Sequence, residues 1–322
     1  MKDTRAVLLM AYGGPNNLDD VEPYLLDVRG GRQTPRELIE EIRERYAAIG
    51  GKSPLLEMTC SQARALEEEL NRNGQHKFQV FVGMRHWKPY IHETIREIAQ
   101  KGIRELITVC MTPFESRMST GAYYEQLKKA IDSEDIEEDW RQNLSLFQIG
   151  AWYSHPLFVK AAAVNLKNSM EEILALGQHK PFVVFTAHSL PAALANQGDP
   201  YEKQFAELSR LVAEEAGLRT EEWTYCFQSA GAAAGRWLGP TLEETINRLS
   251  ATGYTTILVS AIGFLCDHVE VLFDIDIEAK KFAEKKGVTL YRTPSMNSNP
   301  LFIKAMASIL LSGDYRYGDY QK

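Results

Sequence analysis

A histidine ends an apolar stretch in the second half of the chain, where the sequence reads FVVFTAHSLP over residues 182–191. The run Phe182–Phe185 is rich in β-forming residues and predicts a buried strand, so His188 lies at that strand's carboxyl end. An imidazole has a reference pKa of about 6.5 and is a common metal ligand. His188 is therefore a candidate base or metal ligand, with a hydrogen-bonded core histidine as the alternative.

Carboxylates recur in ILVSAIGFLCDHVEVLFDIDIEAKK, residues 257–281, a stretch that predicts a strand, a glycine turn and then a helix. Glu270, Asp274 and Glu278 follow at intervals of four, and like charges at this spacing share a helix face and repel. A solvated acidic face is one interpretation. A functional site is the other, because apolar side chains crowd the same turns and leave no clean polar face. Two further carboxylates lie nearby, Asp267 and Asp276.

His188 and Glu270 both follow predicted strands of the second half of the chain. One imidazole and one carboxylate suit Fe²⁺ and leave most of its coordination sphere open. A storage or structural site would supply more ligands, so an incomplete site is typical of a metal that is handed on. The adjoining row of carboxylates would attract divalent cations and pass protons.

Strands and helices alternate along the chain, which predicts a mostly parallel sheet with helices on both faces. Eight strands in two groups of four indicate an α/β fold with two doubly wound halves. The polar, Gly-containing connection Leu176–Lys180 places the division, giving domains at 1–176 and 177–322. Ligands of such sheets bind beyond the carboxyl ends of the strands, where His188 lies.

The expected elements are defined by their apolar patterns. The predicted strands are Ala6–Tyr12, Phe78–Gly83, Leu106–Thr112, Leu144–Ala151, Phe182–Ala187, Trp223–Gln228, Thr256–Gly263 and Val288–Tyr291. The predicted helices include Glu37–Ile49, Ser61–Asn71, His92–Lys101, Pro156–Ala175, Tyr201–Ala216 and Thr241–Ala251.

Composition excludes several classes of protein. The net charge of −7 over 322 residues argues against a general nucleic-acid binder, and no apolar run approaches the length of a membrane span. The start, MKDTRAVLLMAYGGP, predicts a first strand rather than a signal peptide, because its short apolar part runs into a turn. The four cysteines are widely spaced and favour a reducing cytoplasm. The tail SGDYRYGDYQK holds no cysteine, so we expect no iron–sulfur cluster there.

Eight motifs, taken in order, resemble the ferrochelatase family, whose members insert Fe²⁺ into a porphyrin in haem synthesis. The resemblance implies two Rossmann-like domains of the chelatase type with a porphyrin cleft between them. The first domain would carry the lip of the cleft and the second the metal-site residues. The motifs are MAYGGP (10–15), RYAAIGGKSPL (45–55), GMRHWKPYI (83–91), TAHSLP (186–191), GDPY (198–201), FQSAG (227–231), WLGP (237–240) and GFLCDHVEVLFDID (263–276).

The resemblance also implies roles for single residues. His188 and Glu270 match the pair that faces the pyrrole nitrogens and coordinates iron, and which of them is base and which is ligand stays open. Asp274 and Glu278 match an acidic series that relays protons or metal along a partly π-helical segment, whose wider turn would explain the spacing of four. Tyr12 matches the residue that contacts the metal from the opposite porphyrin face.

The family has two branches, and the resemblance favours the one that uses coproporphyrin III. Protoporphyrin IX ferrochelatases, the alternative, usually carry Asn-Leu-Gly or Asn-Met-Gly where this chain has Ala11-Tyr12-Gly13. Coproporphyrin III carries more propionates than protoporphyrin IX, and arginines are suitable partners for them. The residues that match macrocycle- and propionate-holding positions are Arg29, Arg45, Tyr46, Ser53 and Tyr123.

From this resemblance we expect porphyrin and Fe²⁺ as substrates, with no required cofactor and no nucleic acid. We expect a cytoplasmic monomer that meets neighbouring enzymes of the haem pathway transiently. Two rivals share the fold class. A non-catalytic tetrapyrrole or metal carrier could lose His188 or Glu270, and both are present. A sirohydrochlorin chelatase would lack MAYGGP.

Overall fold

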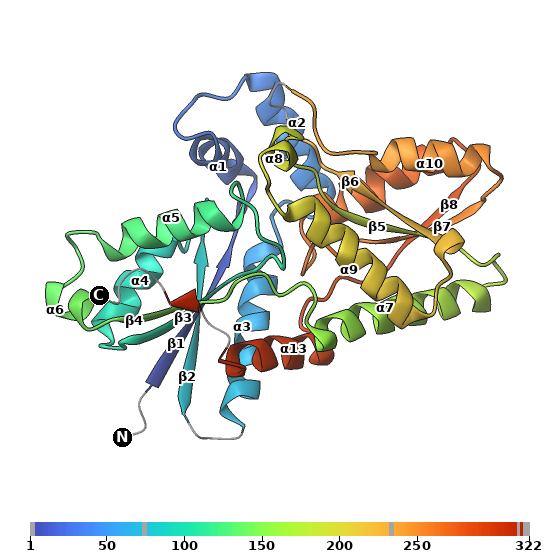
Figure 1. Ribbon diagram of the computed structural model, residues 1–322. Coiled ribbons are helices and arrows are strands. Elements are labelled where there is room, and N and C mark those ends of the chain that lie inside the picture. The colour runs from blue at the N-terminus through green and yellow to red at the C-terminus, as the bar shows by residue number, and fades with distance from the viewer. Residues whose placement is uncertain (1–3, 73–75, 232–234, 314–315, 318–322) are drawn as a thin grey trace. The chain divides into compact units, whose positions relative to one another are not determined.

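The computed structural model describes residues 4–72, 76–231, 235–313 and 316–317 (Figure 1). The chain forms two compact units: unit 1 comprises Met1–Trp152 and Asn297–Lys322, and unit 2 comprises Tyr153–Met296. This division differs from the expected one at residue 176. The polar connection follows helix α7 (Pro156–Ala175), and α7 packs against α9 (Tyr201–Ala216) within unit 2. The chain therefore leaves unit 1 before α7 rather than after it.

Among its described residues, unit 1 contains a five-stranded sheet in the order β2-β1-β3-β4-β9. The central strand β1 (Thr4–Ala11) pairs in parallel with β2 (Lys77–Met84) and β3 (Glu105–Cys110). Strand β4 (Ser145–Gln148) continues the parallel set, and the short β9 (Arg316–Tyr317) adds an antiparallel edge. The first four strands confirm the sequence prediction, whereas β9 was not predicted.

The sheet of unit 1 is covered by helices whose apolar residues recur at helical spacing. Ile91, Ile95 and Ile98 of α4 pack with Leu8 of β1 and Leu127 of α5 in one buried core cluster. The described helices of unit 1 are η1 (Leu18–Asp20), α1 (Val21–Val28), α2 (Arg36–Ala48), α3 (Leu55–Asn71), α4 (Ile91–Gln100), α5 (Thr120–Ile131), α6 (Glu138–Gln142) and α13 (Pro300–Leu311).

The described part of unit 2 contains a four-stranded parallel sheet in the order β6-β5-β7-β8. Its strands are β5 (Phe182–His188), β6 (Trp223–Gln228), β7 (Thr256–Ser260) and β8 (Thr289–Arg292). Because the strands are parallel, their last residues lie at one edge of the sheet. Polar side chains end every one of these strands, and this edge is where a ligand site is expected.

Helices that follow the strands of unit 2 complete the α/β pattern. Ile246 of α10 and Ile275 of η3 pack with Val259 of β7 in a second buried core cluster. No described helix is both long and apolar enough to cross a membrane. Besides α7 and α9, the described helices of unit 2 are α8 (Ala193–Asn196), η2 (Thr220–Glu222), α10 (Leu242–Ala251), α11 (Val269–Leu272), the π-helix η3 (Asp274–Ala279) and α12 (Lys280–Glu284).

Candidate active site

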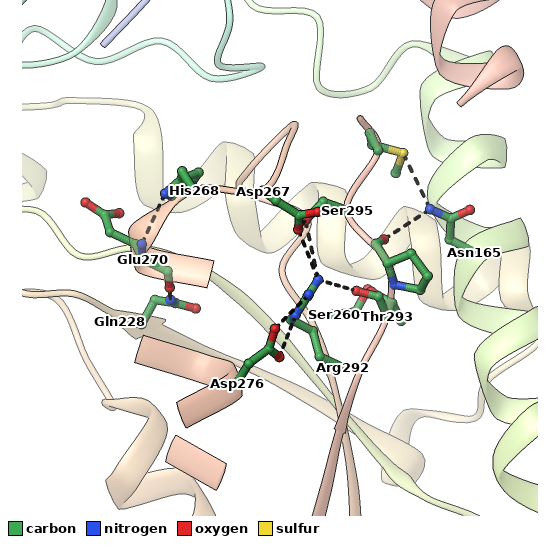
Figure 2. Close-up of polar contacts among 12 residues, drawn as sticks. Asn165, Gln228, Ser260, Asp267, His268, Glu270, Asp276, Arg292, Thr293 and Ser295 are labelled. Atoms are coloured by element: carbon green, nitrogen blue, oxygen red, sulfur yellow. Dashed lines mark hydrogen bonds and ion pairs between the residues drawn. The ribbon is translucent and has the colours of Figure 1, made fainter. Parts of the chain in front are cut away.

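The structure brings His188 and Glu270 together in unit 2, although 82 positions separate them in the sequence. Nδ1 of His188 lies 3.0 Å from Oε2 of Glu270, and each side chain is 33% exposed. The Tyr201 hydroxyl donates to the backbone carbonyl of His188 at 2.8 Å. The Gln228 side-chain amide donates to the carbonyl of Glu270 at 2.7 Å (Figure 2). Both members of the pair are thus fixed through their backbone as well as through each other.

A glycine lets the chain after β7 reach His188. A Cβ atom at Gly263 would lie 2.4 Å from Cβ of Ala187, so only glycine fits, and the Gly263 amide donates to the Thr186 carbonyl at 3.1 Å. The sequence suggested that a helix begins directly after Gly263. In the structure a loop follows this glycine and leads to α11. His268 caps that helix by accepting from the Glu270 amide at 3.2 Å (Figure 2).

The pair is polarised as an ion pair. Burial lowers the pKa of His188, but the charge of Glu270, the hydrogen bond to it and the charge of Asp274 outweigh burial and raise that pKa above its usual value. Burial raises the pKa of Glu270, yet His188 and His268 hold it well below its usual range. The pair therefore favours an imidazolium beside a carboxylate, and a metal ion that binds there competes with a proton.

The acidic ladder, defined as Glu270, Asp274 and Glu278, runs along two short helices, α11 and η3. The Glu278 amide donates to the carbonyl of Phe273, five residues earlier, at 2.9 Å, as a π-helix requires. The wider turn expected from the family resemblance is therefore present. Ser229, which has a positive φ of 58°, donates its hydroxyl to Asp274. Exposure rises along the ladder from the partly buried Glu270 to the exposed Glu278.

The two other carboxylates of this region belong to a different cluster. Arg292, at the end of β8, contacts both oxygens of Asp276 at 2.8 and 2.9 Å and lies 3.5 Å from Asp267 (Figure 2). Ser295 donates to Asp267 at 2.7 Å. Asp267 and Asp276 therefore share one guanidinium, which pairs directly with Asp276 and lies further from Asp267. Sequence reasoning missed Arg292, although its strand-end position is the signal that singled out His188.

In unit 1 the chain after β1 gathers three of the predicted residues. Tyr12 is 41% exposed and directly follows that strand. A Cβ atom at Gly14 would lie 2.5 Å from Oγ of Ser53 and 3.7 Å from the hydroxyl of Tyr46. The Ser53 amide donates to the Pro15 carbonyl at 2.8 Å. Glycine at position 14 is thus what allows Tyr46 and Ser53 to approach this segment.

An arginine that the sequence analysis did not select links Tyr12 to Tyr123. The Arg85 guanidinium carbon lies 5.9 Å from the ring centroid of Tyr12 and 5.6 Å from that of Tyr123. Cations over aromatic faces are attracted at such distances. The Tyr12 ring also lies 4.7 Å from the ring of His86, whose Nδ1 is 2.7 Å from Asp27. These neighbours fix the orientation of Tyr12.

The two predicted propionate-binding arginines have different surroundings. Arg45 pairs with Glu41 at 2.9 Å on the partly exposed surface of α2. Nε of Arg29 is buried and makes no hydrogen bond to the residues that the structure describes. Arg29 lies at the end of α1. The structure thus brings Tyr46 and Ser53 to the segment after β1 and connects Tyr12 with Tyr123 through Arg85.

Comparison with known proteins decides the family. A family model described as Ferrochelatase matches residues 4–313. The chain belongs to the ferrochelatase family. It is 39% identical over 304 residues to a protein of Deinococcus radiodurans named ferrochelatase, covering 94% of each chain. It is 34% identical over 321 residues to the coproporphyrin III ferrochelatase of Geobacillus kaustophilus, covering 99% of each.

Solved structures agree on the fold of this ferrochelatase family member. SirB from Bacillus subtilis with Fe³⁺ is 13% identical and has a TM-score of 0.57, covering 99% of this chain and all of SirB. This likeness confirms the expected α/β architecture with two Rossmann-like domains. Within the described ranges, no group of three or more His, Cys, Asp and Glu side chains could hold a metal ion.

Proposed function

We propose that this ferrochelatase inserts Fe²⁺ into coproporphyrin III in haem synthesis and belongs to the lyase class. The observation that carries the proposal is the His188–Glu270 contact at 3.0 Å, one imidazole and one carboxylate with open coordination positions. Metal insertion asks for a ligand that binds Fe²⁺ weakly and a base that takes the pyrrole protons. This pair supplies one of each.

The protonation of the pair suggests an order of events. Oε2 of Glu270 accepts from His188, so Oε1 can bind the arriving ion. A dication on this carboxylate cancels the charge that raises the pKa of His188, while burial still lowers it. The imidazole then releases its proton, and Nε2 becomes free to accept a pyrrole proton. In the porphyrin-free protein the deprotonated Nε2 of His188 is a second ligand of the ion beside Glu270. In the insertion step His188 leaves the ion and is the base, while Glu270 remains the ligand.

The acidic ladder offers the exit for those protons. Asp274 follows Glu270 by four residues and accepts a hydrogen bond from the Ser229 hydroxyl. Glu278 is exposed, so a proton or an ion can exchange with solvent there. The same carboxylates would attract Fe²⁺ in the opposite direction, because a row of negative charges raises the local concentration of a dication.

The choice of coproporphyrin III is supported by the Geobacillus kaustophilus relative, which carries that substrate in its name and matches 99% of each chain. Arg29 supports it too, because its buried Nε makes no hydrogen bond within the described residues and can donate to a propionate. Arg85 brings a further cation beside Tyr12 and Tyr123. A protoporphyrin IX ferrochelatase is the competing assignment, since the Deinococcus radiodurans relative is named ferrochelatase without a porphyrin.

We also propose that the enzyme needs no resident cofactor and works as a cytoplasmic monomer that meets neighbouring haem-pathway enzymes transiently. The thiols support a site without sulfur ligands. All four cysteines are free, and burial raises the pKa of Cys110, Cys226 and Cys266 to about 12. The proposed ligand pair, His188 and Glu270, contains no sulfur.

The test is an anaerobic incubation of the purified protein with Fe²⁺ and either porphyrin, followed by its visible spectrum. Faster conversion of coproporphyrin III supports the proposal. Faster conversion of protoporphyrin IX would move the chain to the other branch of the family. Binding of a porphyrin without metal insertion would instead support the non-catalytic carrier.

A further inference from the structure

Arg292 is the most fully bonded cation of the described metal-site region. Its side chain is only 13% exposed. Nε and Nη2 contact the two oxygens of Asp276 at 2.8 and 2.9 Å, and Nη1 donates to the Thr293 carbonyl at 2.9 Å. Nη1 also lies 3.4 Å from Oγ of Ser295 and 3.5 Å from Oδ1 of Asp267. The guanidinium therefore joins several groups in a fixed plane (Figure 2).

The two carboxylates that Arg292 holds bracket the metal-site segment. Asp267 lies in the loop before α11, and Asp276 lies inside the π-helix η3. Glu270 and Asp274 stand between them in the sequence. A planar fork that grips Asp276 with two parallel hydrogen bonds fixes the rotation of η3 about its axis, as a single charge cannot. Through its contact with Asp267, the Arg292 guanidinium also fixes the position of the loop in front of α11.

Arg292 also decides which carboxylates can meet a dication. Five acidic side chains lie between positions 267 and 278, and all could attract Fe²⁺. Asp267 and Asp276 share the single positive charge of Arg292, and both oxygens of Asp276 are engaged by it. The carboxylates left for a cation are then those of the acidic ladder.

We propose that Arg292 is a positioning residue for metal delivery, an inference that rests on the proposed function. It sets the π-helical register that aligns the acidic ladder with His188, and it withdraws Asp267 and Asp276 from metal binding. Within the part of the chain that the structure describes, Arg292 pairs with Asp276 and Asp267 rather than with Glu270 or His188, so it acts through the segment that it holds. Groups bonded directly to metal ligands typically change metal affinity or activity about ten- to a hundredfold when they are replaced, and Arg292 acts one contact further away, so we expect the lower end of that range.

The test compares Arg292→Lys with wild type in steady-state insertion at varied Fe²⁺ and in anaerobic calorimetric titration of the porphyrin-free protein with Fe²⁺. Lysine keeps the charge but cannot form the two-pronged contact. We expect a KM for Fe²⁺ and a Kd for Fe²⁺ that are about tenfold or more above wild type, with an unchanged porphyrin Kd. Wild-type values for Fe²⁺ in Arg292→Lys would overturn the inference.

A second variant separates positioning from stability. In Arg292→Met/Asp267→Asn/Asp276→Asn, neither of the two partly exposed carboxylates is left without its cation, so thermal stability should recover relative to Arg292→Met. Positioning predicts that the Kd for Fe²⁺ stays raised, and its return to the wild-type value would refute positioning. Arg210→Gln is the matched control, because Arg210 pairs with Glu214 on an exposed face of α9 in the same unit. Wild-type protein that binds Fe²⁺ but inserts it into neither porphyrin would contradict the proposed function alone.

Discussion

Replacing Glu270 by Gln removes one negative charge from the metal site with almost no change of shape. The carboxylate lies 3.0 Å from the imidazole, and both side chains are 33% exposed. A charge-assisted hydrogen bond in such a partly shielded place contributes about 1.5–3 kcal/mol. That range corresponds to about a ten- to a hundredfold change in an equilibrium or rate constant.

The loss of turnover should exceed the ten- to hundredfold effect of losing one hydrogen bond, because the Glu270 carboxylate is also proposed to bind the ion. We expect kcat for Fe²⁺ insertion to fall by about 10²–10⁴-fold, the usual contribution of a positioned acid–base group, with porphyrin affinity unchanged. Anaerobic spectroscopic assays at saturating porphyrin measure the first quantity, and fluorescence titration measures the second. Circular dichroism and thermal unfolding verify that the variant is folded.

The pH dependence of metal binding provides an independent readout of the same substitution. In wild type the pKa of His188 is raised, so protons compete with the metal up to that pKa and metal affinity rises with pH until it is passed. In Glu270→Gln the carboxylate charge that raises the pKa of His188 is removed while burial still lowers that pKa, so the rise in metal affinity should end at lower pH. An unshifted pH profile together with near-wild-type kcat would refute the reasoning.

Three further substitutions test the rest of the site. His188→Ala should abolish metal insertion but leave the fold and porphyrin binding nearly intact, as measured by turnover and fluorescence titration; near-normal turnover would make His188 a core histidine. Asp274→Asn and Glu278→Gln should have smaller effects that shrink as Fe²⁺ is raised, and equally mild effects in all ladder variants would indicate a solvated face. Arg29→Ala should weaken the binding of coproporphyrin III by up to about 1.5–3 kcal/mol, and by less if the contact is exposed. The difference in binding and turnover between coproporphyrin III and protoporphyrin IX should therefore become smaller.

Much of the fold was predictable because local signals agree with tertiary packing. The bounds of α7 and α9 match the prediction, since Pro156 begins the first helix and Gly217, with a φ of 76°, ends the second. His188 could be placed at a strand end because a buried parallel strand is a continuous apolar run. The apolar run alone does not indicate which carboxylate contacts the His188 imidazole in the folded chain.

The remaining features depend on contacts that a linear pattern does not contain. Strand β9 has two residues, too few for a periodic signal. The pairing of Arg292 with Asp276 joins β8 to the π-helix, and the sequence spacing of 16 has no local meaning. The spacing of four in the acidic ladder fits an ordinary helix as well as a π-helix, so the π-helical turn was expected from the family resemblance and not from the spacing itself.

The central claim is that Fe²⁺ binds at the His188–Glu270 pair before it enters the porphyrin. X-ray absorption at the iron edge of porphyrin-free protein loaded anaerobically with Fe²⁺ tests it most directly. The account predicts scattering from one imidazole in wild type, its loss in His188→Ala, and a weakened iron complex in Glu270→Gln. Iron whose imidazole scattering is the same in wild type and in His188→Ala would contradict the account.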